Sequence, residues 1–248
     1  MSPIPLEENL DWWWYKAKTN LLKFIIENKR QTIDRSFNKI LEIGPGLGNN
    51  LKYLSSLGVV DILETEPEFI KYIELNRENY INKIYNNIDK IEEKYDFIVM
   101  LDVLEHIENS QEFMLSVNQI LKRSGEVILG VPAYSQLWSS HDEKLDHYRR
   151  YNWKKIYSDC NSFDIAERYG FNFLLLPIRY LQILLNKTST TNEGGNLTNN
   201  ILYSVSIFES TLRKIGINPK FGISLYAKLK KKKTWNEFFI FILKVALI

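Results

Sequence analysis

Three glycines at alternate positions, Gly44, Gly46 and Gly48, form the pattern in this chain that most clearly indicates ligand binding. They follow a short apolar run at 40–43 and precede a helix-compatible stretch at 49–57. Because glycine has no Cβ, its backbone can approach a ligand closely at the carboxyl end of a strand. The order of strand, glycine turn and helix therefore predicts a nucleotide-like ligand at this point.

An acid stands at the end of the next apolar run, 59–63. A carboxylate at that place, Glu64, can accept hydrogen bonds from both ribose hydroxyls of an adenosine. The G-x-G-x-G spacing differs from the G-x-G-x-x-G of dinucleotide sites, and we interpret it as favouring S-adenosylmethionine. The alternative is an ordinary βαβ unit in which the glycines only shape a turn.

The three histidines of the chain, His106, His141 and His147, fall in segments expected above the carboxyl ends of neighbouring strands. Histidine can take up a proton near neutral pH. A hydroxyl group that attacks the methyl group of S-adenosylmethionine must lose a proton to such a base. We predict that His147 is the general base, with His141 as the second candidate, and that His106 shapes the cofactor loop. His141, Asp142 and His147 would make a weak metal set on an irregular loop, so no metal is predicted.

Charged residues accompany these histidines. Asp142 either caps a turn together with His141 or takes part in the proton transfer. Arg149 and Arg150 either bind a phosphate or carboxylate of the acceptor through paired hydrogen bonds, or form an exposed ion-pair cluster with Glu143 and Asp146.

Alternating strand and helix patterns from 40 to 131 predict an α/β fold with helices on both faces of a mostly parallel sheet. The expected strands are 40–43, 59–63, 83–85, 96–101, 126–131, 163–169 and 223–229. The expected helices are 12–29, 49–57, 67–79, 110–121, 152–160, 171–186 and 197–215.

These motifs resemble the class I S-adenosylmethionine-dependent methyltransferases, whose fold is a Rossmann-like, seven-stranded sheet. The glycine loop and Glu64 are similar to the first two motifs of that family, 95–107 to its fourth strand and the loop after it, and 121–129 to its turn into the fifth strand. The chain also resembles one bacterial subgroup of this family, which is associated with polysaccharide and glycolipid biosynthesis. The segments that carry this narrower resemblance are 12–15, 131–133, 138–142, 147–151 and 221–225.

The resemblance implies that the cofactor lies across the carboxyl ends of the first, second and fourth strands. Glycine-loop carbonyls would receive its ammonium, with help from Glu42 through water. Asn87 is the nearest match to an acid that contacts adenine in the family, and it keeps an acceptor without a charge. The implied cofactor-binding residues are Glu42, Gly44, Pro45, Gly46, Gly48, Glu64, Thr65, Asn87, Ile88, Leu101, Asp102, Val103 and His106.

The expected organisation has three parts. Residues 1–36 form an N-terminal helical cap, whose aromatic residues Trp12, Trp13 and Tyr15 either close over the ligands or belong to the core. A methyltransferase domain follows at 37–230, with an active-site loop at 132–152 and a helical insertion at 171–215. The tail at 231–248 is basic and then apolar, and it either contacts an anionic lipid surface or packs on protein.

Composition narrows the classes of protein. An apolar fraction of 45% and a charged fraction of 25% are ordinary for a globular chain, and a net charge of +2 gives no reason to expect a nucleic-acid partner. A single cysteine, Cys160, excludes an intramolecular disulfide. The absence of a signal-like start and of an apolar run of about 20 residues predicts a cytoplasmic protein, in contact with the inner membrane surface at most through its tail.

The function expected from the sequence is O-methylation of a sugar hydroxyl in a glycan or glycolipid intermediate, with S-adenosylhomocysteine as the product. One alternative is methylation of an amine or carboxylate on a small metabolite, which needs no base. Another alternative is a non-catalytic subunit that binds the cofactor and supports a partner.

Overall fold

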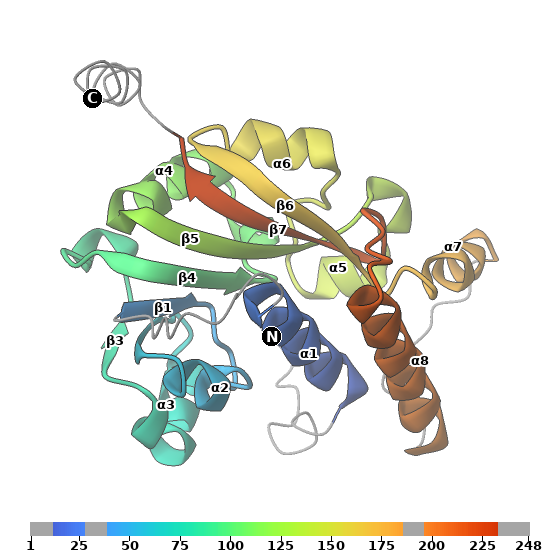
Figure 1. Cartoon of the computed structure of the whole chain (residues 1–248), viewed down its shortest axis with the longest axis horizontal. Helices are drawn as coiled ribbons and strands as arrows, with labels where there is room; N and C mark the ends of the chain where they lie inside the picture. The colour runs from blue at the N-terminus through green and yellow to red at the C-terminus, as the bar shows by residue number, and fades with distance from the viewer. Residues whose placement is uncertain (1–11, 28–38, 186–195, 233–248) are drawn as a thin grey trace, which may run out of the picture.

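The computed structural model describes residues 12–27, 39–185 and 196–232 (Figure 1). Its centre is a seven-stranded sheet in the order β3-β2-β1-β4-β5-β7-β6, in which β7 runs antiparallel to both of its neighbours. This arrangement confirms the α/β class and the mostly parallel sheet. The strands are β1 (Lys39–Ile43), β2 (Val59–Leu63), β3 (Lys83–Tyr85), β4 (Tyr95–Leu101), β5 (Leu121–Pro132), β6 (Phe163–Phe171) and β7 (Ser224–Lys231).

Within the described part of the chain there are eight α-helices and four short 3₁₀ turns; α1 precedes the first strand and the others lie between strands. The helices are α1 (Trp13–Glu27), α2 (Leu51–Ser55), α3 (Pro67–Asn76), α4 (Ser110–Ile120), α5 (Ser140–Lys144), α6 (Trp153–Asp159), α7 (Leu176–Leu184) and α8 (Asn196–Lys214). The 3₁₀ turns are η1 (Glu78–Tyr80), η2 (Ile88–Lys90), η3 (Leu104–His106) and η4 (Ser135–Leu137).

The sheet separates two apolar cores because successive side chains of a strand point to opposite faces. On β4, Ile98 and Met100 belong to the core that α4 and α6 cover, whereas Phe97 and Val99 belong to the core that α1 and α2 cover. Each large aliphatic side chain buried in this way contributes about 1.5–3 kcal/mol. This packing fixes the strand ends, and with them the loops that carry the expected site.

Three sequence expectations are corrected by the structure. The segment 121–125, expected as a turn, belongs to β5 because Leu121 pairs with Tyr95 before a shift in register. The active-site loop 132–152 is partly regular, since it contains η4 and α5. The insertion is not helical from residue 171, because pairing with Ser224 of β7 keeps Phe171 in β6.

The structure describes only part of the two ends of the chain. The N-terminal cap is described through α1, whose buried side chains include Trp13, Leu22 and Ile25. The expected tail, 231–248, lies outside the described residues except for its first two positions. Among the described residues, no helix is both long and apolar enough to cross a membrane.

Candidate cofactor and acceptor site

The glycine loop after β1 is packed on one side and open on the other. Gly44 has φ +64°, and a Cβ built on it would lie 2.5 Å from Val103 Cγ2, in the loop after β4. Gly46 has φ +55°, and no atom lies within 4 Å of its would-be Cβ. Pro45 is buried, and its carbonyl accepts a hydrogen bond from Gly48 N at 2.9 Å, which closes the turn. The open space beside Gly46 is where a ligand can approach the backbone.

Glu64 joins the ends of β1 and β2 through backbone hydrogen bonds. Its Oε1 accepts from Thr65 N at 2.8 Å and Glu66 N at 3.1 Å, and its Oε2 accepts from Gly46 N at 3.2 Å. Burial raises the pKa of this carboxyl, and the backbone donors oppose that effect. A carboxylate has about four acceptor positions, so three backbone donors leave room for one ligand hydroxyl and not for both.

We expect Glu64→Ala to weaken S-adenosylmethionine binding by roughly tenfold to a hundredfold, because a hydrogen bond to a charged group contributes about 1.5–3 kcal/mol. Titration calorimetry measures the change. The matched control is Glu66→Ala, which removes an exposed acid two residues away. A folded Glu64→Ala protein with parental affinity would contradict the assignment.

Glu42, near the end of β1, is the second buried acid of this edge. Its Oε1 accepts from Asn50 Nδ2 at 2.9 Å, while no described residue donates to its buried Oε2. Burial raises its pKa to about 7, although the Asn50 hydrogen bond opposes the shift. A buried oxygen without a donor costs free energy, and a ligand ammonium would satisfy it. Glu42 therefore fits the ammonium end of S-adenosylmethionine.

We expect cofactor affinity to fall by about tenfold per pH unit below pH 7, because Glu42 is neutral below its pKa of about 7 and attracts a cation only above it. Calorimetry between pH 6 and 8 measures this slope. Glu42→Gln should bind with an affinity that changes little over the same range. If the Gln variant keeps the parental slope, the titrating group is another acid, and Glu64 is the next candidate.

The loop after β4 carries Asp102 in the left-handed backbone region, with φ +54°. Its carboxylate pairs with the ammonium of Lys18 from α1, which also lies 5.8 Å from the Trp14 ring and 5.9 Å from the Tyr15 ring. The N-terminal helix therefore reaches the edge where the resemblance places the methionine end. Leu101, beside Asp102, is partly buried in the core that α1 covers.

The residues expected on the adenine side, Asn87 and Ile88, make contacts within the protein. Asn87 Oδ1 accepts from Asp89 N at 2.9 Å and so caps η2, which leaves one lone pair for an adenine amino group. Ile88 is partly buried against the core on the α4 face. Trp13 is buried in the opposite core, which favours the core alternative for that residue over a lid.

Asp142 organises the acceptor side of the site. This fully buried residue accepts from His147 Nδ1 at 3.0 Å and from Arg150 Nε at 2.7 Å. Its Oδ2 also accepts from Ser139 N at 2.9 Å, within a capping box at the start of α5. Burial favours the neutral acid, but the hydrogen bonds from His147 and Arg150 outweigh it and hold the pKa of Asp142 well below its usual range. The carboxylate is thus ionised and fixes the His147 ring.

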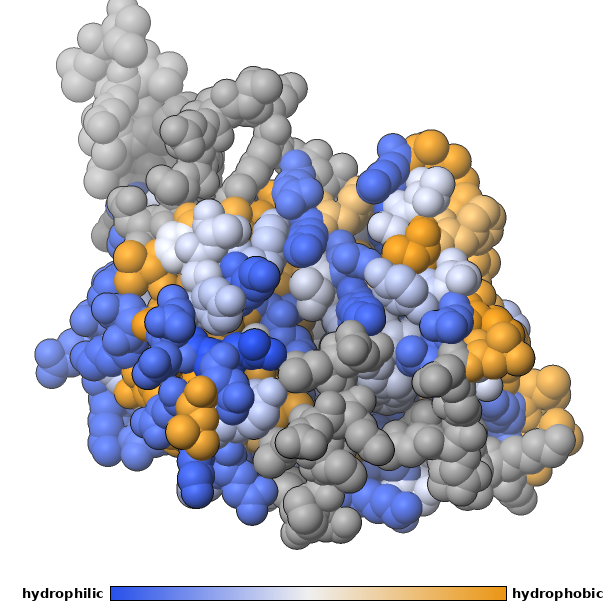
Figure 2. Space-filling model, turned by 90° about the horizontal axis from the view of Figure 1, so that it is seen from below, coloured by the Kyte–Doolittle hydropathy of each residue, from blue (hydrophilic) through white to orange (hydrophobic). Residues whose placement is uncertain are grey.

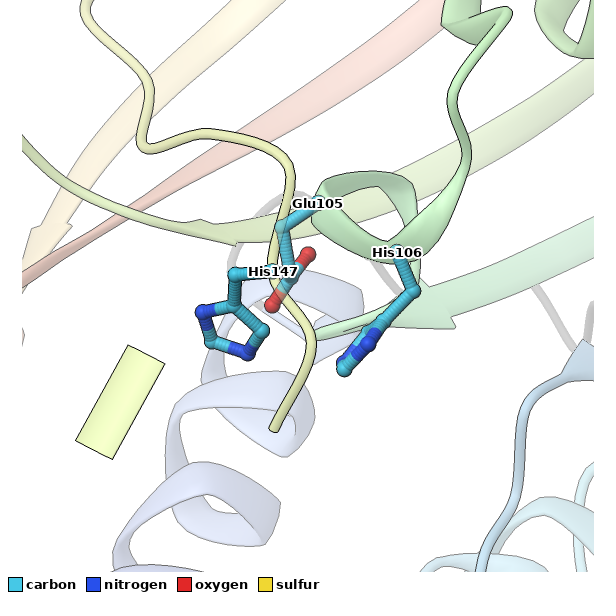
Figure 3. A group of neighbouring side chains, drawn as sticks. All are labelled: Glu105, His106 and His147. Carbon is cyan, nitrogen blue, oxygen red and sulfur yellow. The ribbon is translucent and has the colours of Figure 1, made fainter. Parts of the chain in front are cut away.

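The side chains of Glu105 and His106, from the segment after β4, and of His147, from the segment after α5, lie close together (Figure 3). Their potential ligand atoms all lie within 4.8 Å of one another, and the two imidazole rings meet edge to face at 4.6 Å between centroids. Burial lowers the pKa of His106, and the charge of His147 lowers it further. Burial raises the pKa of Glu105 well above its ordinary value. The cluster has the atoms for a proton relay or for holding a cation.

Arg149 and Arg150 have different surroundings. Neither alternative expected from the sequence, binding of an acidic acceptor group or an exposed ion-pair cluster, describes both of them. Arg150 makes a two-point contact with Asp142 and donates to Ala133 O at 3.2 Å. Arg149 donates to Ser110 Oγ at 2.6 Å and to Glu108 O at 2.7 Å. Arg150 therefore fixes the buried carboxylate of Asp142. The guanidinium of Arg149 binds instead at the start of α4.

His141 differs from His147 although both lie close to Asp142 in the sequence. His141 is an exposed residue of α5, and its backbone carbonyl accepts from Leu145 N at 3.2 Å. Asp142 caps the start of α5 together with Ser139, and not together with His141 as one alternative from the sequence had it. The structure thus forms an Asp142–His147 dyad, joined by the hydrogen bond between His147 Nδ1 and Asp142 Oδ1.

Two residues at the site were missed by the sequence analysis. Glu105 directly precedes His106, and its position in the loop after β4 was a signal that could have identified it. Lys18 had no local signal, because its partner Asp102 is 84 residues away.

A family model described as a methyltransferase domain matches residues 10–174, which is more than half of the chain. A ubiquinone biosynthesis O-methyltransferase of Rickettsia typhi is 29% identical over 134 residues, covering 48% of this chain and 54% of that protein. The chain thus spans about half the length of the curated relatives it matches first.

Solved structures show the same fold at low identity. The N-methyltransferase NodS from Bradyrhizobium japonicum, in complex with S-adenosylhomocysteine, has a TM-score of 0.57 at 13% identity, over 93% of this chain and 92% of that one. An S-adenosylmethionine-dependent methyltransferase from Clostridium acetobutylicum has a TM-score of 0.55 at 13% identity, over 89% and 92%. With its glycine loop, its strand-end acids and its matching family model, this chain belongs to the methyltransferase domain family.

Proposed function

We propose that this protein transfers a methyl group from S-adenosylmethionine to a hydroxyl oxygen of a small-molecule acceptor, with His147 as the general base. The observation that carries the proposal is the bond from His147 Nδ1 to the buried, ionised Asp142. A proton held on Nδ1 by that carboxylate leaves Nε2 as the acceptor. An imidazole oriented by an acid in this way is a common arrangement for a general base.

The cofactor supplies an electrophilic methyl group, and the residues of the chain bind and orient it. Glu64 would accept a hydrogen bond from a ribose hydroxyl, Glu42 would accept one from the ammonium, and the backbone at Gly46 would allow close approach. On the other side, His147 takes up the proton that the acceptor oxygen loses. Positioning of this kind can supply much of the rate acceleration.

Oxygen as the acceptor atom is supported by those curated relatives that are named ubiquinone biosynthesis O-methyltransferases. The sugar hydroxyl expected from the sequence has no support among them, and we therefore widen the proposed acceptor class to hydroxyl groups of small molecules in general. Methylation of an amine or a carboxylate needs no general base, so the Asp142–His147 dyad would have no role in it. A subunit without activity would likewise leave it unused.

The test is mass spectrometry of products after incubation with S-adenosylmethionine and separate panels of phenols, sugars, amines and carboxylates. A mass increase of one methylene on a hydroxyl compound, accompanied by S-adenosylhomocysteine, is the expected result. Methylation confined to amines or carboxylates would overturn the acceptor class. Cofactor binding without a product in any panel would support the non-catalytic alternative.

A further inference from the structure

The outer side of α8 carries a stripe of exposed apolar residues. Leu197, Ile201 and Phe208 of α8, and Ile215 directly after its last residue, are between 55% and 74% exposed. Their spacings of four and seven residues place them on one side of a helix with 3.6 residues per turn. No other described element covers this stripe, so its apolar area faces outward.

The neighbouring helix α7 repeats the pattern. Ile178, Leu181 and Leu185 are each more than half exposed, and they too follow helical spacing. Figure 2 shows hydrophobic residues gathered along the side of the molecule on which Figure 1 places α7 and α8. We call this the α7–α8 face, comprising these three residues and the α8 stripe.

A shallow, open groove lies beside the apolar stripe of α8. This groove of about 450 Å³ is lined mainly by Leu174, Ile201, Val205 and Phe208. A groove of this composition offers hydrocarbon contact and few hydrogen-bonding groups. It therefore suits an apolar chain or side chain better than a polar ligand.

Among the described residues from 172 to 223, the exposed charged side chains are basic. Between residues 172 and 223, Glu209 is the only acid that the structure describes, and it is buried and paired with Arg213 at 3.3 Å. Lys214 and Lys220 are exposed at the edge of the same region. Helix seams between proteins are typically flanked by charges of both signs, whereas basic residues beside an apolar helix face suit anionic lipid headgroups.

We propose that the α7–α8 face docks this protein on an anionic lipid surface. The apolar stripe enters the boundary between headgroups and acyl chains, and Lys214 and Lys220 contact the headgroups. The face is tied to the acceptor side, because Arg179 of α7 donates to Ser139 Oγ at 3.1 Å, next to the Asp142 capping box. Docking would thus bring the loop with the proposed base to the membrane, a consequence that rests on the proposed function.

Vesicle flotation tests the docking directly. We expect the full chain to float with phosphatidylglycerol vesicles and to float poorly with phosphatidylcholine vesicles. The variant Ile201→Asn, Phe208→Asn, Ile215→Asn should lower the partition coefficient by roughly a hundredfold or more, because each large apolar side chain that enters the lipid raises partitioning by about tenfold. The matched control is Leu75→Asn, Leu115→Asn, Tyr157→Asn, which changes exposed residues of α3, α4 and α6 and should float like the parent.

Several outcomes would overturn the proposal. Absence of flotation, or equal flotation of the stripe variant and the parent, would remove the lipid surface as the partner. A parent that is dimeric and a stripe variant that is monomeric in ultracentrifugation would identify a second copy as the partner. Loss of flotation only when the chain is shortened to end at Lys233 would assign lipid contact to the tail. Flotation requires no acceptor and no turnover, so its failure leaves the proposed function standing.

Discussion

Replacing His147 with alanine is expected to lower turnover by about 10²–10⁴, the usual contribution of a general base. The affinity for S-adenosylmethionine should change little, because the side chain bonds to Asp142 and not to the glycine loop or Glu64. Steady-state kinetics on an acceptor from the panels, together with calorimetry on the cofactor, separates the two effects.

His141→Ala is the matched control for this experiment, since it removes an exposed histidine from the same segment. We expect it to retain most of the parental turnover. Near-parental turnover of His147→Ala would exclude it as the base. If a chelator abolishes turnover of the parent and a divalent cation restores it, His147 serves with Glu105 and His106 as a metal ligand instead.

Replacing Asp142 with alanine is expected to lower the free energy of unfolding by about 3–5 kcal/mol, the typical cost of leaving a buried charge without its partner. The stranded group is Arg150, whose side chain is 6% exposed. The same substitution releases the His147 ring and opens the capping box of α5, so turnover should fall as well. Urea unfolding measures the stability change.

Two further variants make this result specific. Glu143→Ala, at an exposed position of the same helix, should change stability by less than about 0.5 kcal/mol. Asp142→Ala combined with Arg150→Met should regain much of the missing stability, because no unpaired charge remains, but none of the turnover. A single Asp142→Ala variant as stable as Glu143→Ala would show that the buried pair contributes little.

The stability contribution of Asp142 should also depend on pH. Its folded-state pKa lies below the ordinary value of an aspartate, so its contribution is fully present above that value and is lost as the pH falls towards the folded-state pKa. The parent should therefore lose more stability than Asp142→Ala on acidification below about pH 4. Unfolding curves at pH 3 and pH 6 measure the difference.

The sequence by itself determined the fold class and the edge of the sheet at which a cofactor would lie. Strand and helix periodicities are local, because they follow from which side chains of a short segment face the core. The positive φ angles of Gly44, Gly46 and Gly48 are also local, since they are the conformations for which glycine is selected in a turn. Glu64 could be placed for the same reason, because it directly follows an apolar strand.

Tertiary packing decided how the charged side chains are paired. Arg149 and Arg150 are adjacent in the sequence, yet one contacts the start of α4 and the other holds Asp142. His141 and His147 were both candidates for the base in the sequence, with His147 ranked first, and only His147 is bonded to that buried acid. Such pairings depend on how elements distant in the chain pack, and no local periodicity encodes them. The contact of Lys18 with Asp102, and the pairing of Leu121 with Tyr95 that turned an expected loop into strand, arose in the same way.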